Sequence, residues 1–253
     1  EGFCAVTVRL PWGDIPPDGL RAVAAIAETY AAEVRSAISQ NLLLRFVPEE
    51  ALGGLYEALL EAGLALPEAH TLLDITRCPG ADTCNLAITR SRGLAQALEA
   101  HLSALPLAQD PGAKAIGVKI SGCPNSCGQH HIADIGFYGS SRKVGEREVP
   151  HYVLLLGGRT REGEARFGQV VGRIPARRVP EAVERILKRY LEERQNGESF
   201  QAYLDRVGAA SFKPLLQDLQ EVPPYEEAPE FYQDLGAEGE AFSVQLGRGE
   251  CAV

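Results

Sequence analysis

The sequence predicts an α+β protein in which a small βαβα unit precedes a larger mixed α/β domain. Segments of β-rich composition alternate with segments of helical periodicity through residues 3–62, and a second series of strands and helices follows a loop around Pro67. We therefore assign residues 1–68 to the small unit and residues 69–220 to the larger domain. Residues 221–253 are expected to form an acidic, extended C-terminal tail.

The small unit has the pattern of strand, helix, strand and helix. Residues 3–10 (FCAVTVRL) alternate partly and end at a Pro-Trp-Gly turn, and residues 41–47 (NLLLRFV) form a second, more apolar strand. Residues 18–34 follow two prolines with an alanine-rich helical pattern, and the helix at residues 49–62 stops before Gly63. Because two strands make only a marginal sheet, we expect another polypeptide segment to complete it.

The larger domain combines strands around the cysteines with helices toward the C-terminus. Its apolar runs and helical repeats predict, in chain order, a strand at 72–76, a helix at 85–102, strands at 115–121, 132–138 and 151–156, and helices at 180–194, 199–207 and 214–219. After Pro223 and Pro224 the chain becomes polar, acidic and rich in turn residues, which predicts an extended segment on the surface.

Composition and charge narrow the possible partners and location. The 253 residues are 45% apolar, which is enough for a core, and no apolar run is long enough for a membrane helix. The net charge of -9 argues against nucleic acid or a membrane as partner. Residues 77–143 are nevertheless locally basic, with a net charge of +3, whereas residues 218–253 hold nine acidic residues against one arginine. The cysteines suit a reduced compartment and the N-terminus lacks a secretory signal, so we expect a cytoplasmic protein.

Four of the six cysteines lie in two pairs along the sequence, and their spacing indicates the kind of site that they form. Five residues separate Cys78 from Cys84, three separate Cys123 from Cys127, and 38 lie between the two pairs. Each pair begins with Cys-Pro, where proline has no amide hydrogen and other amides of the loop remain free to point at sulfur. The spacing favours an iron-sulfur cluster, because zinc sites usually have a shorter gap within each pair. A structural zinc ion and four unrelated buried thiols remain as alternative interpretations.

The sequence around these cysteines resembles one family closely. The segments CPGADTCNLA and GCPNSCGQHHIADIGFYG resemble the siroheme-dependent nitrite and sulfite reductases. The segments GFCAVTVRLPWG, ISQNLLLRFVPEEAL and ESFQAYLDRVG extend the resemblance over residues 2–213. The resemblance implies the C-terminal half of an assimilatory-type reductase, in which a ferredoxin-like half domain precedes a siroheme and 4Fe-4S domain.

The resemblance also implies the cofactors and their ligands. Cys78, Cys84, Cys123 and Cys127 would bind a 4Fe-4S cluster, and Cys127 would also bridge the cluster to the siroheme iron. Asn125 matches a position close to the cluster and the macrocycle. The reaction implied is the six-electron reduction of nitrite to ammonia or of sulfite to sulfide.

The expected partners follow from the half-enzyme interpretation. They are the N-terminal half of the same enzyme or a second copy, the nitrite or sulfite anion, and an electron donor such as ferredoxin or a flavoprotein. In the family the residues that bind the anion come from the other half, so no catalytic residue is assigned in this chain. Five basic residues are left as contributors to the local positive field, namely Arg77, Arg90, Arg92, Lys114 and Lys119.

Two other functions are consistent with the same cysteines. One is a precorrin-3B synthase-like monooxygenase, which keeps the cluster without siroheme, and the other is a non-catalytic iron-sulfur module. His130 and His131 directly follow the second cysteine pair. They could shuttle protons or contact a siroheme carboxylate, or they could simply pack against their own strand.

Overall fold

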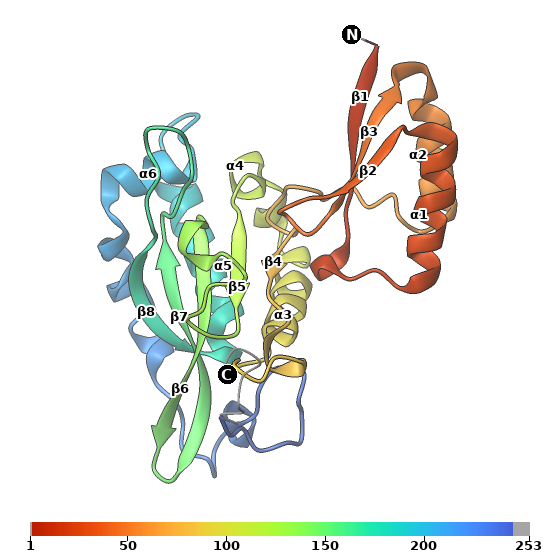
Figure 1. Ribbon diagram of the computed structural model, residues 1–253. Helices are drawn as coiled ribbons and strands as arrows, with labels where there is room; N and C mark the ends of the chain where they lie inside the picture. The colour runs from red at the N-terminus through yellow and green to blue at the C-terminus, as the bar shows by residue number, and fades with distance from the viewer. Residues whose placement is uncertain (1, 245–253) are drawn as a thin grey trace. The chain divides into compact units, whose positions relative to one another are not determined.

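The computed structural model describes residues 2–244, and the chain divides into two compact units, Glu1–Thr76 and Arg77–Val253 (Figure 1). The last nine residues of the predicted tail, 245–253, lie outside the described part of the chain. Within residues 2–244, no helix is long and apolar enough to span a lipid bilayer.

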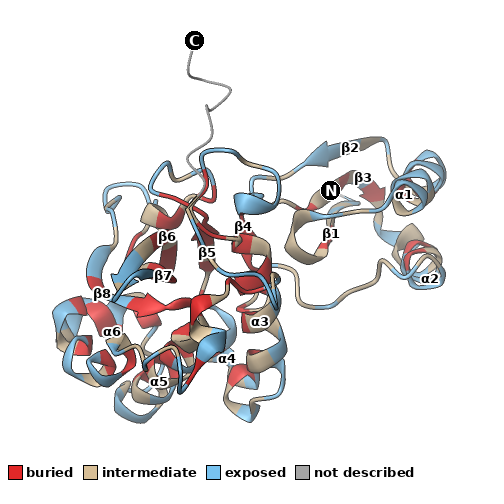
Figure 2. Ribbon diagram, turned by 90° about the horizontal axis from the view of Figure 1, so that it is seen from below, coloured by how far each residue is buried: buried red, intermediate tan, exposed pale blue. Residues whose placement is uncertain are grey.

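The first unit is a three-stranded antiparallel sheet with two helices on one face. Its central strand is β3, flanked by β1 and β2. In chain order the elements are β1 (Phe3–Val8), α1 (Pro17–Tyr30), β2 (Glu33–Ser36), β3 (Leu42–Pro48) and α2 (Leu52–Glu61). The helices α1 and α2 lie on the same side of this sheet in Figures 1 and 2.

Strand β2 corrects the two-strand interpretation of this unit. The helix expected over residues 18–34 ends at Tyr30, and Glu33–Ser36 instead pairs with β3. Glu33 faces Arg45 across the two strands, and the carboxylate accepts a hydrogen bond of 2.7 Å from the Arg45 guanidinium. An edge strand this short and polar has little hydrophobic pattern, so the periodicity of the preceding helix concealed it.

The core of the first unit lies between the sheet and its helices. Leu44 and Val47 of β3 are fully buried against Val23 of α1 and Leu55 of α2, among other apolar side chains. Beyond this core, Arg9 is buried after β1, and its guanidinium donates a 2.6 Å hydrogen bond to the carbonyl oxygen of Leu73. This contact fixes the segment that leads out of the unit.

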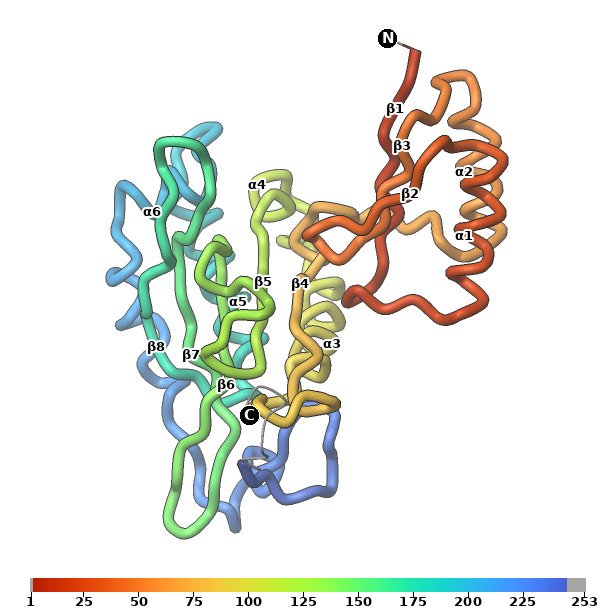
Figure 3. The backbone as a smooth tube through the Cα atoms, in the orientation of Figure 1, coloured from red at the N-terminus to blue at the C-terminus, as the bar shows by residue number. Residues whose placement is uncertain are grey.

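The second unit is built on a mixed five-stranded sheet in the order β4-β5-β6-β7-β8. Strands β5 and β6 are parallel, whereas β6, β7 and β8 are successively antiparallel. Figure 3 follows the chain through this sheet. In chain order the elements are β4 (Thr76–Arg77), α3 (Ser91–Ser103), α4 (Pro111–Lys114), β5 (Val118–Ser121), β6 (Ile135–Val144), β7 (Arg147–Leu156), β8 (Gln169–Pro175), α5 (Val179–Glu193) and α6 (Phe200–Val207).

Helices α3 and α5 provide the apolar side of the second unit. Leu94 and Leu98 of α3 and Ile186 and Leu187 of α5 are fully buried, and Figure 2 shows the buried residues concentrated in the sheet and these helices. The burial of Phe137 in β6 completes the same core. The strand-helix mixture is the α+β arrangement that the sequence predicts.

Several elements of the second unit differ from the sequence-based expectation. The strand expected at 72–76 is confined to Thr76–Arg77, because the preceding residues form a turn in which the Asp74 amide donates to the Thr71 carbonyl oxygen. The helix expected from residue 85 begins at Ser91, because the preceding residues form a loop hydrogen-bonded to the next cysteine segment. Strand β8 was not expected, since Gln169–Pro175 is short, is interrupted by a glycine and an arginine, and is partly exposed. The segment 214–219 forms short 3-10 turns in place of a helix.

The described part of the tail, 221–244, has little regular structure but packs on the second unit. Its only helical turn is Pro229–Tyr232 in the described range. Tyr232 and Leu235 are buried, and the Asp234 carboxylate is buried with them. The expected surface segment is therefore anchored by buried side chains.

Candidate metal centre

The four paired cysteines come together at one end of the second sheet. Cys78 directly follows β4 and Cys123 lies just beyond β5, and these two strands are neighbours. Burial raises the pKa of the Cys123 thiol, and the neighbouring thiols of Cys78, Cys127 and Cys84 raise it further. These effects indicate that the other three thiols lie in the neighbourhood of Cys123. The fold thus unites two pairs that are separated by 38 residues in sequence.

The first cysteine loop, residues 78–90, is held by backbone hydrogen bonds to the second. The amides of Ile88 and Thr89 both donate to the carbonyl oxygen of Gly122, at 2.8 and 3.0 Å. Within the loop, the Cys84 amide donates to Gly80, which has a φ of +68° that favours glycine. The loop therefore cannot move independently of the second cysteine pair.

Gly122 marks the closest approach of the two loops. A Cβ atom at this position would lie 2.7 Å from the carbonyl oxygen of Thr89 and 2.9 Å from the Cα atom of Gly80. Both neighbours are backbone atoms, which cannot rotate away as a flexible side chain can. Glycine is thus required here by packing, and its small size brings Cys78 and Cys123 together.

Backbone amides point at two of the sulfur atoms. The Gly122 amide donates to Cys78 Sγ at 3.0 Å, and the Asn125 amide donates to the Cys123 thiol. Hydrogen bonds of this kind lower the energy of a thiolate and tune the potential of an iron-sulfur cluster. The loops that begin with Cys-Pro therefore supply the free amides that the sequence predicts.

Ser121 ties the two ends of the second loop together. Its Oγ accepts a 3.0 Å hydrogen bond from the Gly128 amide and lies 2.9 Å from His130 Nδ1. Ser121 and His130 are both fully buried. Inside the loop, Ser126 and Gln129 have positive φ angles of 62° and 61°, which the clamp at its ends helps to maintain.

His130 and His131 form part of an aromatic stack. The two rings lie 4.1 Å apart, and the His130 ring lies 4.8 Å from that of Tyr138 on β6. Burial, together with a smaller effect of the neighbouring His131, lowers the pKa of His130 to about 4, so His130 is neutral near pH 7. Packing against the strand is therefore the role of His130 that these contacts support.

The four thiols differ in exposure. Cys78 and Cys123 are buried, at 6% and 8% exposed, whereas Cys84 is half-buried and Cys127 is exposed. Asn125 is exposed beside Cys127. In residues 2–244, no group of three or more His, Cys, Asp or Glu side chains is placed to hold a single metal ion. The donor set that converges here consists of sulfur alone, which suits iron in a cluster.

The basic residues expected near the cysteines take separate positions. The Arg77 side chain is buried and its guanidinium donates to the Cys78 carbonyl oxygen at 3.4 Å. Arg90 binds the C-terminal segment, and Lys119 donates to Gln129 in the second loop at 3.0 Å. Lys114 is exposed before β5, at the end of the strand away from the cysteines.

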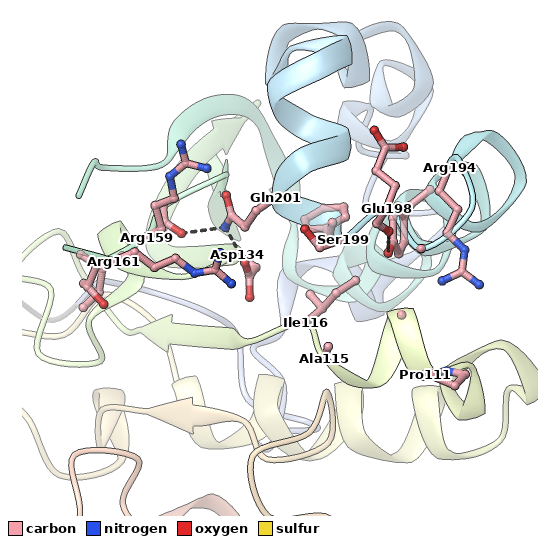
Figure 4. Close-up of a pocket in the computed structure, with 17 residues that line it drawn as sticks. Pro111, Ala115, Ile116, Asp134, Arg159, Arg161, Arg194, Glu198, Ser199 and Gln201 are labelled. Atoms are coloured by element: carbon pink, nitrogen blue, oxygen red, sulfur yellow. Dashed lines mark hydrogen bonds between the residues drawn. The ribbon is translucent and has the colours of Figure 1, made fainter. Parts of the chain in front are cut away.

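A separate cavity of about 580 Å³ lies at that other end of β5 (Figure 4). Gln201 donates from its side-chain amide to the Asp134 carboxylate and, at 2.9 Å, to the Gly158 carbonyl oxygen. Burial raises the pKa of Asp134. None of the described residues that line this cavity is a cysteine, so it is distinct from the convergent thiols.

Ser121 is the residue of this site that the sequence interpretation did not single out, and the contacts that join it to Gly128 and His130 were not foreseen either. The role of Ser121 depends on contacts with the end of the second loop. The one available signal was the Ser-Gly pair directly before Cys123, which is typical of a tight turn after a strand.

Comparison with known proteins places this chain among redox proteins that contain a 4Fe-4S domain. Residues 68–222 match the Nitrite and sulphite reductase 4Fe-4S domain, and residues 1–62 match the Nitrite/Sulfite reductase ferredoxin-like half domain. The chain therefore belongs to the nitrite and sulfite reductase family. The family and the α+β class predicted from the sequence are both confirmed.

Curated relatives include both kinds of reductase. The chain is 31% identical to a ferredoxin–nitrite reductase of Synechococcus elongatus over 62% of this chain and 30% of the relative. It is 28% identical to a sulfite reductase [ferredoxin] of Mycolicibacterium paratuberculosis over 82% of this chain and 38% of the relative. The chain thus spans about a third of the length of these relatives.

Solved structures agree with the sequence comparison. The Mycobacterium tuberculosis NirA protein superposes with a TM-score of 0.70 and 28% identity, over 81% of this chain and 38% of that chain. Dissimilatory sulfite reductase I superposes with a TM-score of 0.62 at 14% identity, over 94% of this chain and 75% of that chain, which shows a shared fold alone.

Proposed function

We propose that this chain is the cluster-bearing, C-terminal half of a siroheme-dependent nitrite or sulfite reductase. The observation that carries the proposal is the convergence of Cys78, Cys84, Cys123 and Cys127 on two loops fastened to each other through Gly122. The relatives named above are reductases, so a monooxygenase is not favoured.

The four thiols fit a 4Fe-4S cluster in number, chemistry and surroundings. Cys78 and Cys123 accept hydrogen bonds from backbone amides, and their burial excludes water from that side of the cluster. Cys127 is the exposed thiol, so it is the ligand that a second large group can approach. We assign Cys127 the bridge to the siroheme iron and Asn125 a position beside the macrocycle.

When bound, the cluster and siroheme supply the electrons and the iron at which the anion is reduced. The chain's own contribution is to orient the thiols, to donate amide hydrogen bonds to sulfur and to screen one side of the cluster from water. The residues that bind nitrite or sulfite belong to the N-terminal half or a second copy, and ferredoxin or a flavoprotein supplies electrons. The choice between the two anions is set in that other half.

Anaerobic reconstitution with ferrous iron and sulfide tests the proposal. The protein should bind about four irons and four acid-labile sulfides, as the cluster formula requires. Cys78→Ser, Cys84→Ser and Cys123→Ser should each lose most of this iron. Cys4→Ser is the matched control, because this partly buried free cysteine lies in the first unit. Zinc without sulfide in the reconstituted protein would refute the cluster assignment.

A further inference from the structure

The end of the described chain folds back over the first cysteine loop. Figure 3 shows this segment, in blue, beside the loop that follows β4. Asp234 makes the central contact, since its carboxylate accepts a 2.7 Å hydrogen bond from the Arg90 amide at the start of α3. The same carboxylate accepts a 2.9 Å hydrogen bond from the Leu235 amide. Asp234 is only 4% exposed, although it lies in the most acidic part of the chain.

Arg90 connects this segment to the loop from the other side. Its guanidinium donates to the Gly236 carbonyl oxygen at 3.2 Å and lies 3.4 Å from the Glu240 carboxylate. The same guanidinium lies 3.6 Å from the carboxylate of Asp82, inside the first cysteine loop. One arginine thus joins the loop to two points of the C-terminal segment.

Gly93 shows how tightly the segment packs on α3. A Cβ atom at Gly93 would lie 1.9 Å from the carbonyl oxygen of Leu235 and 2.3 Å from its carbonyl carbon. Both are backbone atoms, so any side chain at residue 93 must displace the segment. This packing is independent of the hydrogen bonds of Asp234.

The segment also covers one side of Cys84. A cavity of about 240 Å³ lies between them, lined by Cys84 and Asn85 on one side and by Ala237 and Phe242 on the other. The Phe242 amide donates to the carbonyl oxygen of the buried Tyr232 at 2.8 Å, which fixes the far end of the covering.

We propose that residues 228–244 form a strap that positions the first cysteine loop and screens Cys84 from solvent, with Asp234 as its anchoring residue. The strap lies beyond residue 222, where the match to the 4Fe-4S domain ends. The inference that the strap positions the loop rests only on contacts within this chain. Screening of a cluster at Cys84 rests in addition on the proposed function.

Two substitutions loosen the strap by different routes. Asp234→Asn keeps one acceptor oxygen but turns an amide group toward one of the two backbone amides, whereas Gly93→Ala pushes the strap away sterically. Asp205→Asn is the matched control for charge, because Asp205 pairs with Arg159 and Arg166 away from the strap. Gly53→Ala is the control for glycine, because nothing lies within 4 Å of the added methyl group.

Amide hydrogen exchange in the metal-free protein tests the positioning role. The amides of Cys84, Ile88 and Thr89 are hydrogen-bonded in the loop and report its opening. Asp234→Asn loses one charge-assisted hydrogen bond, and Gly93→Ala displaces the strap sterically. Each variant should reduce the protection of these amides about tenfold. The two controls should leave protection unchanged. Unchanged protection in both Asp234→Asn and Gly93→Ala, with the proteins folded, would overturn the strap.

Iron release to a ferrous chelator, measured on the anaerobically reconstituted protein, tests the screening role. Both strap variants should release iron about tenfold faster, in step with the loss of protection. Release at the unaltered rate despite faster amide exchange would overturn the screening of Cys84. If the protein binds no cluster at all, the proposed function is wrong. The amide-exchange experiment on the metal-free protein still tests whether the strap positions the loop.

Discussion

Replacing Ser121 by alanine removes only one hydroxyl group, but we expect it to lower the free energy of unfolding of the second unit substantially. The Ser121 hydroxyl oxygen accepts a hydrogen bond from the Gly128 amide at 3.0 Å and lies 2.9 Å from His130 Nδ1. Both the serine and the histidine are fully buried. A buried polar group left without its partner costs about 1–3 kcal/mol. With two such groups, the expected loss in the free energy of unfolding is about 2–6 kcal/mol.

Urea denaturation of the metal-free protein, followed by circular dichroism, measures this loss. Ser211→Ala is the control, because Ser211 is a surface residue whose hydroxyl donates to the Gly208 carbonyl oxygen at 2.8 Å. The control should change the free energy of unfolding by about 0.5 kcal/mol or less. A loss below about 1 kcal/mol for Ser121→Ala, or one equal to the control, would refute the clamp across the second loop.

Three further predictions concern the cysteine site and its fold. Gly122→Ala should weaken cluster assembly and cost about 1–3 kcal/mol of stability, measured by iron content and urea denaturation, because the methyl group meets backbone atoms. Cys127→Ser in the complete enzyme should abolish reduction and uncouple cluster and haem in electron paramagnetic resonance, and unaltered spectra would contradict the bridge. His151 is fully buried and its pKa is lowered to about 4, so its contribution to stability is present above pH 6.5 and is lost as pH falls toward 4. That loss should reach about 3 kcal/mol and be absent in His151→Gln, as measured by denaturation at each pH.

The sequence alone was sufficient to identify the family and to indicate a strand before each cysteine pair, although the strand before Cys78 is shorter than expected. Cys-Pro in each pair, and the apolar runs before Cys78 and Cys123, indicated a loop after a strand at each pair. Local patterns of this kind are encoded over a few residues, so a single sequence reveals them. That the two strands are neighbours emerges only from the structure. The edge strands β2 and β8 were missed because their stability comes from pairing with a neighbour. Strand β2 is largely polar, and β8 is short and interrupted by a glycine and an arginine, so neither has a clear strand pattern.

The parts that escaped prediction depend on contacts between distant residues. Asp234 lies among acidic residues that are typical of a solvated surface, yet it meets the Arg90 amide 144 positions away. Nothing in its neighbourhood in sequence distinguishes it from Glu230 or Glu238. Which of these carboxylates is buried depends on the path of the whole chain. The local composition does not contain that information.

The electrostatics of the cysteine site couple metal binding to protonation. Burial is the largest cause that raises the pKa of Cys123, and the adjacent thiols add to it, so the protonated form is favoured before metal binds. Four thiolates in this partly buried space would repel one another, and neutral thiols allow the two loops to pack without that cost. Metal ligation requires thiolates, so assembly must release protons, and the affinity for iron should rise with pH. The hydrogen bond from the Asn125 amide opposes this effect of burial at Cys123. The Gly122 amide points at Cys78 Sγ at 3.0 Å, so the fold supplies amide donors to two of the sulfur atoms.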